Sequence, residues 1–298
     1  MRRITLNRLA KWTIGISLIV CLVVADSCMQ FRMKPVEMEK FYAGRGLHAE
    51  NHTYRIGNRT MHYVKVGDDK LPLVLFVHGS PGSLSSFKSF LADSTLLDKA
   101  MLIAVDRPGF GFSGFGRAER SLEKQAALLK PILEKYKNNR PITLVGHSLG
   151  GPVIARIAMD YPDLVDGLVM VAPSIDPDLE PNEWFRAPLA TPFLKWLLPR
   201  SIRASNDEIY ALKPELQKML PLWSHISAKT IVIQGGKDNL VPPGNAYFAQ
   251  KMITQVPVQL VINEQMNHFV PWTYPHLIKD AVIQLASTQP EQTQLSSH

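Results

Sequence analysis

The stretch ITLVGHSLGGPVIARIA, residues 142–158, constrains the fold of this chain more than any other. An apolar run of strand type stops at the letters GHSLG, residues 146–150, and apolar residues then return with the spacing of a helix. A G-x-S-x-G pattern in this context predicts a turn so tight that side chains two positions from the serine would collide. The sequence therefore predicts that Ser148 projects its hydroxyl from a sharp bend at the end of a buried strand.

Similar apolar runs recur along the chain and alternate with amphipathic segments. Residues 54–67 alternate apolar and polar positions around Gly57 and Asn58, which predicts a two-stranded hairpin. A continuous apolar run follows at 72–77, further strand-like segments at 101–106, 164–171, 229–234 and 258–263, and helical patterns at 121–136, after Ser148 and at 274–286. We therefore expect an α/β fold with a mostly parallel sheet flanked by helices, and reactive side chains at the carboxyl ends of its strands.

Residues 174–228 interrupt this alternation. They lack a strand pattern and are rich in proline and large aromatic residues. Ser205 and Glu208 form a capping-box pattern, which predicts the start of a helix. We expect a helical cap inserted between the sixth and seventh strands, with the following side chains contacting substrate: Trp184, Phe185, Trp196 and Trp223. The alternative is that these helices only cover the surface by hydrophobic packing.

A serine at such a bend needs a base to remove its proton, and the base needs an acid to orient it. His268 follows the last predicted strand and Asp238 follows the one before it, which gives the chain order Ser, Asp, His. Asp176 follows the preceding strand and is an alternative acid. Catalytic roles are therefore predicted for Ser148, His268 and Asp238.

Other polar residues near the strand ends have simpler interpretations. His147 adjoins the serine and would point away from it across the bend, and His225 and His276 lie outside any strand end. Asp106 ends its own strand, but the following letters RPGFGFSG are typical of a structural turn. We expect Asp106 to shape that loop.

Acyl transfer also requires hydrogen-bond donors for the oxyanion. The letters HGSPG at residues 78–82 turn the chain at a strand end, so that the Ser80 N–H is a candidate donor. The Leu149 N–H, which follows the nucleophile, is the second candidate. The alternative is that residues 78–82 are a plain glycine and proline turn.

Taken in order, the segments HGSPGS, DRPGFGFSG, GHSLGG, GGKDNLVPP and NHF resemble the α/β-hydrolase superfamily over residues 54–286. The chain is similar to the branch with a helical cap between the sixth and seventh strands. That branch includes carboxylesterases, carbon–carbon bond hydrolases, cofactor-free haloperoxidases, epoxide hydrolases and haloalkane dehalogenases. The last two use an aspartate at the elbow, where this chain has Ser148. Prolyl aminopeptidases of the branch tend to carry HGGPG and DQRG-type segments, and this chain has Ser80 and DRPG instead.

The resemblance implies a serine hydrolase that cleaves a small or moderately apolar carboxylic ester through an acyl-enzyme. It implies neither a metal nor an organic cofactor. Two alternatives remain open: a carbon–carbon hydrolase or haloperoxidase with the same triad, and a non-catalytic ligand-binding protein on the same fold.

The N-terminus has the pattern of an export signal. Four basic residues, Arg2, Arg3, Arg8 and Lys11, precede an apolar run at 12–24 and the small-residue exit ADS. Residues 1–27 are thus predicted to be a signal peptide or a membrane anchor. Cys28 directly follows and resembles the lipidated cysteine of a bacterial lipoprotein, although Asp26 departs from that pattern. We expect a protein of a bacterial-type cell envelope that is lipid-anchored, secreted or held by its leader.

The remaining charge does not indicate a nucleic-acid partner. The formal net charge of +7 includes the four basic residues of the leader, and the other lysines and arginines are interspersed with acids. Residues 28–53 are expected to form a polar spacer, 54–173 and 229–287 the two parts of the core, and 288–298 a polar tail.

Overall fold

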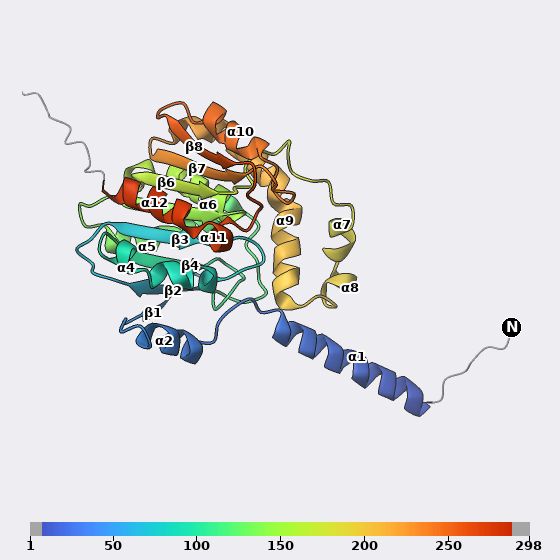
Figure 1. The fold of residues 1–298 in the computed structure, drawn as a ribbon. Coiled ribbons are helices and arrows are strands. Elements are labelled where there is room, and N and C mark those ends of the chain that lie inside the picture. Colours follow the sequence, from blue (N-terminus) through green and yellow to red (C-terminus); the bar gives the residue numbers. More distant parts are fainter. Residues whose placement is uncertain (1–7, 288–298) are drawn as a thin grey trace, which may run out of the picture.

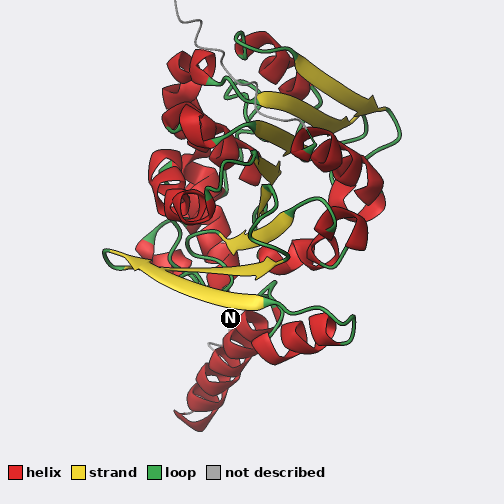
Figure 2. Cartoon of the chain, turned by 90° about the vertical axis from the view of Figure 1, so that its left-hand side faces the viewer, coloured by secondary structure: helices red, strands yellow, loops and turns green. Residues whose placement is uncertain are grey.

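The computed structural model describes residues 8–287, which form one eight-stranded sheet with helices on both faces (Figures 1 and 2). The strand order is β1-β2-β4-β3-β5-β6-β7-β8. The pairs β1–β2 and β2–β4 are antiparallel and the others are parallel, so β2 runs opposite to the other strands of the sheet. The strands are β1 (Glu50–Ile56), β2 (Arg59–Val66), β3 (Leu73–Val77), β4 (Met101–Asp106), β5 (Ile142–His147), β6 (Gly167–Val171), β7 (Lys229–Gly235) and β8 (Val258–Asn263). The predicted fold class and hairpin are confirmed.

Parallel strands in this sheet are buried because helices cover both of their faces. Every residue of β3, β4, β5 and β6 is buried. One face packs against α5 (Leu122–Tyr136), α6 (Gly150–Asp160), α9 (Arg200–Met219) and α10 (Gly244–Met252). The other packs against α2 (Pro35–Ala43), η1 (Leu84–Phe87), α3 (Lys88–Leu91), α4 (Ser94–Leu97), α11 (Val270–Thr273) and α12 (Pro275–Ala286).

The strand register brings the carboxyl ends of the central strands together. Val77 of β3 lies opposite Val105 of β4 on one side and Gly146 of β5 on the other. Gly146 in turn lies opposite Met170 of β6. The loops that leave β3, β4, β5 and β6 therefore begin at one edge of the sheet, where ligands bind in open α/β sheets.

A helical insertion, residues 174–228, lies between β6 and β7. It contains α7 (Arg186–Leu189), α8 (Pro192–Lys195), the long α9 and η3 (Leu220–His225). Figure 1 shows α9 standing beside the carboxyl edge of the sheet, with α7 and α8 outside it. The predicted helix start at Ser205 is wrong, because α9 begins at Arg200 after Pro199. Ser205 and Glu208 thus lie inside the helix, with their side chains buried.

The expected polar spacer at residues 28–53 is also wrong in part. Residues 35–43 form α2, and its Met38 and Tyr42 are buried in the core, because these two residues are one helical turn apart and share a face. The strand β1 already begins at Glu50. Arg32 donates to the Gly111 carbonyl, so this segment is fixed to the core before the first strand begins.

The N-terminal helix α1 (Arg8–Cys28) extends away from the core (Figure 1). Its last turn contacts the insertion, since the Asp26 carboxylate accepts from Arg200 Nε at 2.9 Å and Nη2 at 2.7 Å. Within residues 8–287, none of the helices combines the length and the apolar character that a bilayer crossing requires. The predicted polar tail at 288–298 lies outside the described residues.

Candidate active site

Ser148 lies in the sharp bend that the sequence predicts. Its φ is +53°, in the left-handed region that non-glycine residues seldom adopt. A Cβ on Gly146 would lie 2.5 Å from the Gly150 carbonyl oxygen, and one on Gly151 would lie 2.5 Å from Pro173 Cβ. Both positions therefore require glycine if β5, the bend and α6 are to pack this closely. Such local strain is typical of a functional position.

The predicted base and acid are brought together at the ends of β8 and β7. His268 Nδ1 lies 2.8 Å from Asp238 Oδ2, and both side chains are buried. The other carboxylate oxygen, Oδ1, accepts from the backbone N–H groups of Val241 at 2.8 Å and Leu240 at 2.9 Å. The imidazole is thus oriented by a carboxylate that is itself held in place.

The electrostatics favour an ionised acid in this pair. Burial raises the pKa of Asp238, but the hydrogen bonds from His268 and from the Val241 and Leu240 amides outweigh it and leave that pKa below its ordinary value. Asp238 is therefore a carboxylate at neutral pH. It accepts the Nδ1 proton, which leaves Nε2 of a neutral His268 free to accept a proton from Ser148.

Ser148 Oγ makes no hydrogen bond to this imidazole among the described residues. Nucleophile and base are often loosely paired until a substrate is bound. The ring centroid of His147, the residue directly before Ser148, lies 4.9 Å from the ring centroid of His268.

Within residues 8–287, the alternative acid Asp176 makes its hydrogen bonds to Asp178 and Asn245 and none to His268. The Asp176 carboxylate accepts from the Asp178 N–H, and the Asp176 N–H donates to Asn245 Oδ1. Both bonds hold the loop that follows β6. Asp176 is thus a loop residue in this structure.

No catalytic role is predicted from the sequence for three further histidines: His147, His225 and His276. His225 and His276 are exposed on the surface. His147 is buried, and its Nε2 lies 3.0 Å from the backbone oxygen of His268. A carbonyl only accepts, so His147 Nε2 carries the proton.

Asp106 has the structural role expected of it. Its carboxylate accepts from the N–H groups of Leu84 and Phe112, each at 2.8 Å, and from His62 Nδ1 at 2.8 Å. A Cβ on Gly111 would collide with this carboxylate, which explains a glycine at that point of the turn. Asp106 therefore fixes the loop beside the site.

Both candidate oxyanion donors lie next to the nucleophile. A Cβ on Gly79 would lie 2.9 Å from Ser148 Cβ, so the loop carrying Ser80 passes directly over the serine. Leu149 is the N-cap residue of α6, where backbone N–H groups have no partner within the helix. The helix N-terminus also places partial positive charge beside Ser148.

A buried arginine beside this loop escaped the sequence analysis. Arg107 is 0% exposed, and its guanidinium forms an ion pair with Glu208 of α9, with N–O distances of 2.8 Å. It also donates to the carbonyl oxygens of His78 and Gly79. In the sequence, Arg107 directly follows a predicted buried strand and Glu208 lies in a predicted helix. No sequence pattern indicates that the two residues form an ion pair.

The aromatic residues expected to contact substrate separate into two groups. Trp223 is 1% exposed and packs edge-on against Phe248, so its predicted role is wrong: it belongs to the core. Trp184 and Trp196 are 80% and 56% exposed, and Phe185 is also exposed.

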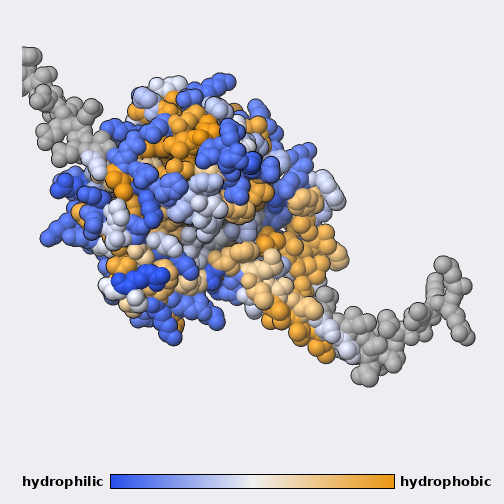
Figure 3. All heavy atoms as spheres, viewed as in Figure 1, coloured by the Kyte–Doolittle hydropathy of each residue, from blue (hydrophilic) through white to orange (hydrophobic). Residues whose placement is uncertain are grey.

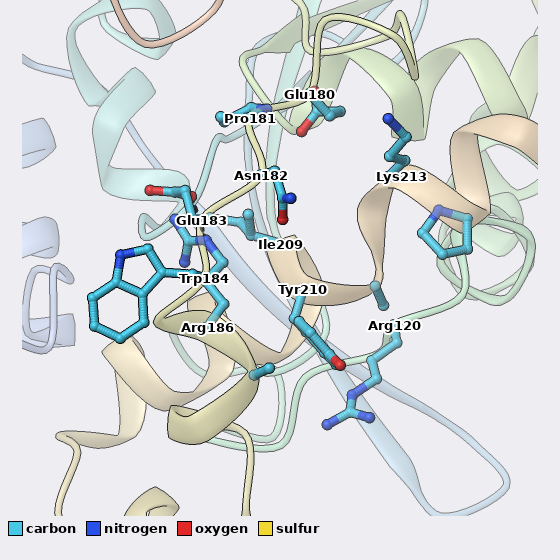
Figure 4. A pocket seen from close by; sticks show the side chains of 13 residues that line it. Arg120, Glu180, Pro181, Asn182, Glu183, Trp184, Arg186, Ile209, Tyr210 and Lys213 are labelled. Atoms are coloured by element: carbon cyan, nitrogen blue, oxygen red, sulfur yellow. Dashed lines mark hydrogen bonds and ion pairs between the residues drawn. The ribbon is translucent and has the colours of Figure 1, made fainter.

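Trp184 borders a cavity of about 650 Å³ between residues 180–187 and α9 (Figure 4). Figure 4 shows charged side chains around it, including Glu180, Arg186 and Lys213. Ser148, Asp238 and His268 do not line it. Glu180, one of its lining residues, accepts a hydrogen bond from Ser174 Oγ in the loop after β6. Burial raises the pKa of Glu180, although this hydrogen bond opposes the shift.

Comparisons with known proteins agree with the fold. The family model described as the alpha/beta hydrolase fold matches residues 72–201. Epoxide hydrolase 1 of Caenorhabditis elegans is 31% identical over 37% of this chain and 27% of its own length. The mouse sn-1-specific diacylglycerol lipase ABHD11 is 32% identical over 35% of this chain and 34% of its own. The chain thus spans about a third or less of these relatives.

A solved structure of a hydrolase from Pseudomonas aeruginosa superposes over 80% of this chain and 99% of its own, with a TM-score of 0.63 at 17% identity. The matched region of the family model includes β3, β4, β5 and β6 with the bend at Ser148. The comparisons and the sheet topology therefore identify the same fold.

Proposed function

We propose that this chain, which has the alpha/beta-hydrolase fold, is a serine hydrolase that cleaves carboxylic esters. The observation that carries the proposal is the coincidence of three features at one sheet edge. Ser148 lies in a strained bend at the end of β5, His268 and Asp238 form a buried hydrogen-bonded pair after β8 and β7, and the loop of Ser80 passes close to Ser148. A hydrolase of this family is supported by relatives that include a diacylglycerol lipase and an epoxide hydrolase.

In the proposed mechanism, His268 Nε2 accepts the Ser148 hydroxyl proton as the oxygen attacks the ester carbonyl. The N–H groups of Ser80 and Leu149 stabilise the oxyanion of the tetrahedral intermediate. Asp238 stabilises the imidazolium, which then protonates the leaving alcohol. Water repeats the sequence on the acyl-enzyme and releases the acid.

The same three residues could serve a carbon–carbon hydrolase, and the epoxide hydrolase relatives raise a further chemistry. The serine at position 148 favours acyl transfer over the epoxide reaction, because the resemblance implies an aspartate at the elbow of epoxide hydrolases. We propose an ester with an apolar portion, since the insertion exposes the aromatic side chains of Trp184, Phe185 and Trp196.

The decisive experiment is hydrolysis of p-nitrophenyl esters from acetyl to long acyl chains by the full chain and by its Ser148→Ala variant. We expect turnover by the wild type, with loss of nearly all of it in the variant. The chain-length optimum then measures the acyl site. A folded wild type that hydrolyses no ester would contradict the proposal.

We further propose that the protein works at the cell envelope and contacts a membrane through its leader or a lipid on Cys28. The described part of α1 exposes Ile16, Ile19, Val20 and Val23, and Figure 3 shows apolar surface along this helix and on the insertion above it. Amphipathic and apolar helices with basic flanks bind membrane interfaces.

Cleavage and retention of the leader differ in their effect on a contact between α1 and α9. Cleavage before Cys28 would remove Asp26 and with it the ion pair to Arg200. Mass spectrometry of the mature N-terminus decides: a diacylated Cys28 supports a lipoprotein, and an intact Met1 supports a retained anchor. An unmodified N-terminus beyond Cys28, with no sedimentation on vesicles, would contradict the membrane contact.

A further inference from the structure

Arg107 uses every donor of its guanidinium inside the protein. Nε donates to the His78 carbonyl at 2.7 Å and Nη2 to the Gly79 carbonyl at 3.0 Å. Nη1 donates to Gln125 Oε1 at 3.1 Å, and Nη1 and Nη2 each donate to the Glu208 carboxylate at 2.8 Å. An arginine offers five N–H donors in a rigid plane, so this set fixes its orientation completely.

The histidine of the same loop adds a second bond to the same carbonyl. The Arg107 backbone N–H donates to His78 Nε2 at 3.0 Å, which requires that nitrogen to be the acceptor. The proton of a neutral His78 is then on Nδ1, which lies 2.7 Å from the Gly79 oxygen and donates to it. Burial, and secondly Arg107, lower the pKa of His78, consistent with the neutral ring.

These bonds fix the direction of the Ser80 N–H. The Gly79 carbonyl and the Ser80 N–H belong to one planar peptide unit and point in opposite directions when the unit is trans. Because two donors hold the Gly79 oxygen on one side, the Ser80 N–H is directed to the other. A rotation of this plane would break two buried hydrogen bonds at once.

The remaining anchor of Arg107 comes from the insertion. Glu208 is on the face of α9 that also carries Ser205, whose Oγ accepts from Ser80 Oγ at 2.9 Å. Both side chains are buried and are one turn apart. Helix α9 therefore contacts the loop of residues 78–82, the oxyanion loop, at two points. Glu208 binds Arg107, which donates to the Gly79 carbonyl, and Ser205 accepts from the Ser80 hydroxyl.

We propose that Arg107 and Glu208 are positioning residues for the oxyanion hole, through which α9 fixes the peptide plane that carries the Ser80 N–H. The inference rests on the proposed acyl-transfer function and deepens it. The helical insertion then does more than cover the substrate, because the oxyanion hole is complete only while α9 is docked.

A buried ion pair could instead be merely structural, since removing one partner of such a pair destabilises a protein wherever it lies. The chain offers a matched control in Glu215. It is a buried glutamate two turns further along the same face of α9, and its Oε2 accepts from the Leu122 N–H at 2.9 Å, at the start of α5. Glu215 thus joins α9 to the core without touching the oxyanion loop.

The test compares Glu208→Gln with Glu215→Gln in the full chain. Each is measured for ester turnover, for thermal stability and for inhibition by phenylboronic acid. Ser148 Oγ adds to the boron while its proton passes to His268, and the tetrahedral adduct places a boron-bound oxygen in the oxyanion hole. Its inhibition constant therefore reports the hole itself.

For Glu208→Gln we expect kcat to fall about 10- to 100-fold with KM changed less than about 3-fold, and boronate binding to weaken in parallel. Glu215→Gln should lower thermal stability less, because the glutamine oxygen can still accept from the Leu122 N–H, and it should leave both activities near the wild type. Arg107→Lys should resemble Glu208→Gln, because an ammonium has three donors and no planar fork, whereas Arg107 uses five donors in one plane. Ser205→Ala should have a smaller effect, since it leaves the Gly79 carbonyl bonds in place.

If Glu208→Gln does not fold, Glu208→Asp serves in its place, because it keeps the charge and withdraws the carboxylate by one methylene. Equal kcat and boronate binding in the folded Glu208 variant and in Glu215→Gln would overturn the inference alone. A wild type without ester turnover would overturn the proposed function and the inference with it.

Discussion

His147 donates its Nε2 proton to the backbone oxygen of His268 across 3.0 Å, so the residue before the nucleophile holds the segment that carries the base. Burial, and then the nearby His268, lower the pKa of His147 to about 4. Its ring is therefore neutral throughout the neutral range. A protonated ring would place a charge inside the site, beside His268.

This burial predicts a pH dependence of stability. In the unfolded chain His147 takes up a proton near pH 6.5, whereas in the folded chain it does so only near pH 4. The unfolded state binds more protons between these values, so stability should fall as pH drops from 6.5 to 4. The contribution of His147 amounts to about 3 kcal/mol at the acid end. Urea unfolding of the wild type and His147→Gln at several pH values measures it.

The glutamine variant keeps an amide that can donate to the His268 carbonyl and does not titrate. The difference in unfolding free energy between the two proteins should therefore shrink or reverse as pH falls. Other titrating groups are common to both and cancel in the comparison. Parallel curves from pH 7 to 4 would show that His147 is not held neutral by burial.

The assignment of the acid yields a second prediction. Asp238→Asn should lower kcat by roughly 10,000-fold, because an amide would favour the wrong imidazole tautomer and could not stabilise its charged form. Asp176→Asn is the matched control, since the hydrogen bond of the Asp176 carboxylate is to the Asp178 N–H of the same loop. Steady-state ester hydrolysis checks both. Full activity in the Asp238 variant with loss in the Asp176 variant would reverse the assignment.

The bend at Ser148 predicts a steric requirement at Gly146. Gly146→Ala should cost about 1–3 kcal/mol of stability and abolish most activity, because its Cβ would press on the Gly150 carbonyl and displace the serine. Gly57→Asn is the control. Gly57 has φ of +56° in the hairpin turn and open space around it, and asparagine tolerates this conformation. Its stability should change by less than about 0.5 kcal/mol.

Thermal unfolding and ester turnover of the two glycine variants give the answer together. If Gly146→Ala kept wild-type activity, the requirement for close packing at the bend would be refuted. If Gly57→Asn were as damaging, glycine substitution itself rather than its place in the bend would be the cause.

The sequence predicted the features that depend on local pattern. The bend at Ser148 could be read because glycines are required where strand, turn and helix pack this closely, and the order of Asp238 and His268 followed from strands ending one after another. These features also lie on a sheet whose buried strands are continuous apolar runs. Local pattern and global fold agree at these points.

Contacts between distant segments could not be predicted in the same way. Arg107 and Glu208 are 101 residues apart, and no pattern in either segment names the other. Ser205 and Glu208 have the spacing of a capping box, yet the helix begins five residues earlier. Instead, Ser205 accepts from the Ser80 hydroxyl and Glu208 pairs with Arg107. Two buried residues, Met38 and Tyr42, are enough to pack the short helix α2 on the core. Two such residues in a mainly polar segment are too weak a pattern to predict a helix.

The tryptophans of the insertion differ in exposure although their residue type is the same. We therefore expect substitutions of these residues to differ in their effect on the free energy of unfolding. Trp223 and Trp196 are both tryptophans in the insertion, but one is buried against Phe248 and the other is half exposed. Trp223→Ala should cost about 3–5 kcal/mol. Trp196→Ala should change stability by less than about 0.5 kcal/mol.

Trp223→Phe separates the cavity from the polar group. Trp223 Nε1 is buried without a hydrogen-bond partner among the described residues, so the indole N–H contributes a desolvation cost and no bond. The phenylalanine variant keeps most of the ring and removes this N–H, and it should be far closer to wild type than the alanine variant. Urea unfolding of all three variants measures the difference. Equal losses for Trp223→Phe and Trp223→Ala would mean that the N–H has a partner in solution, such as a bound water, and would contradict the desolvation cost.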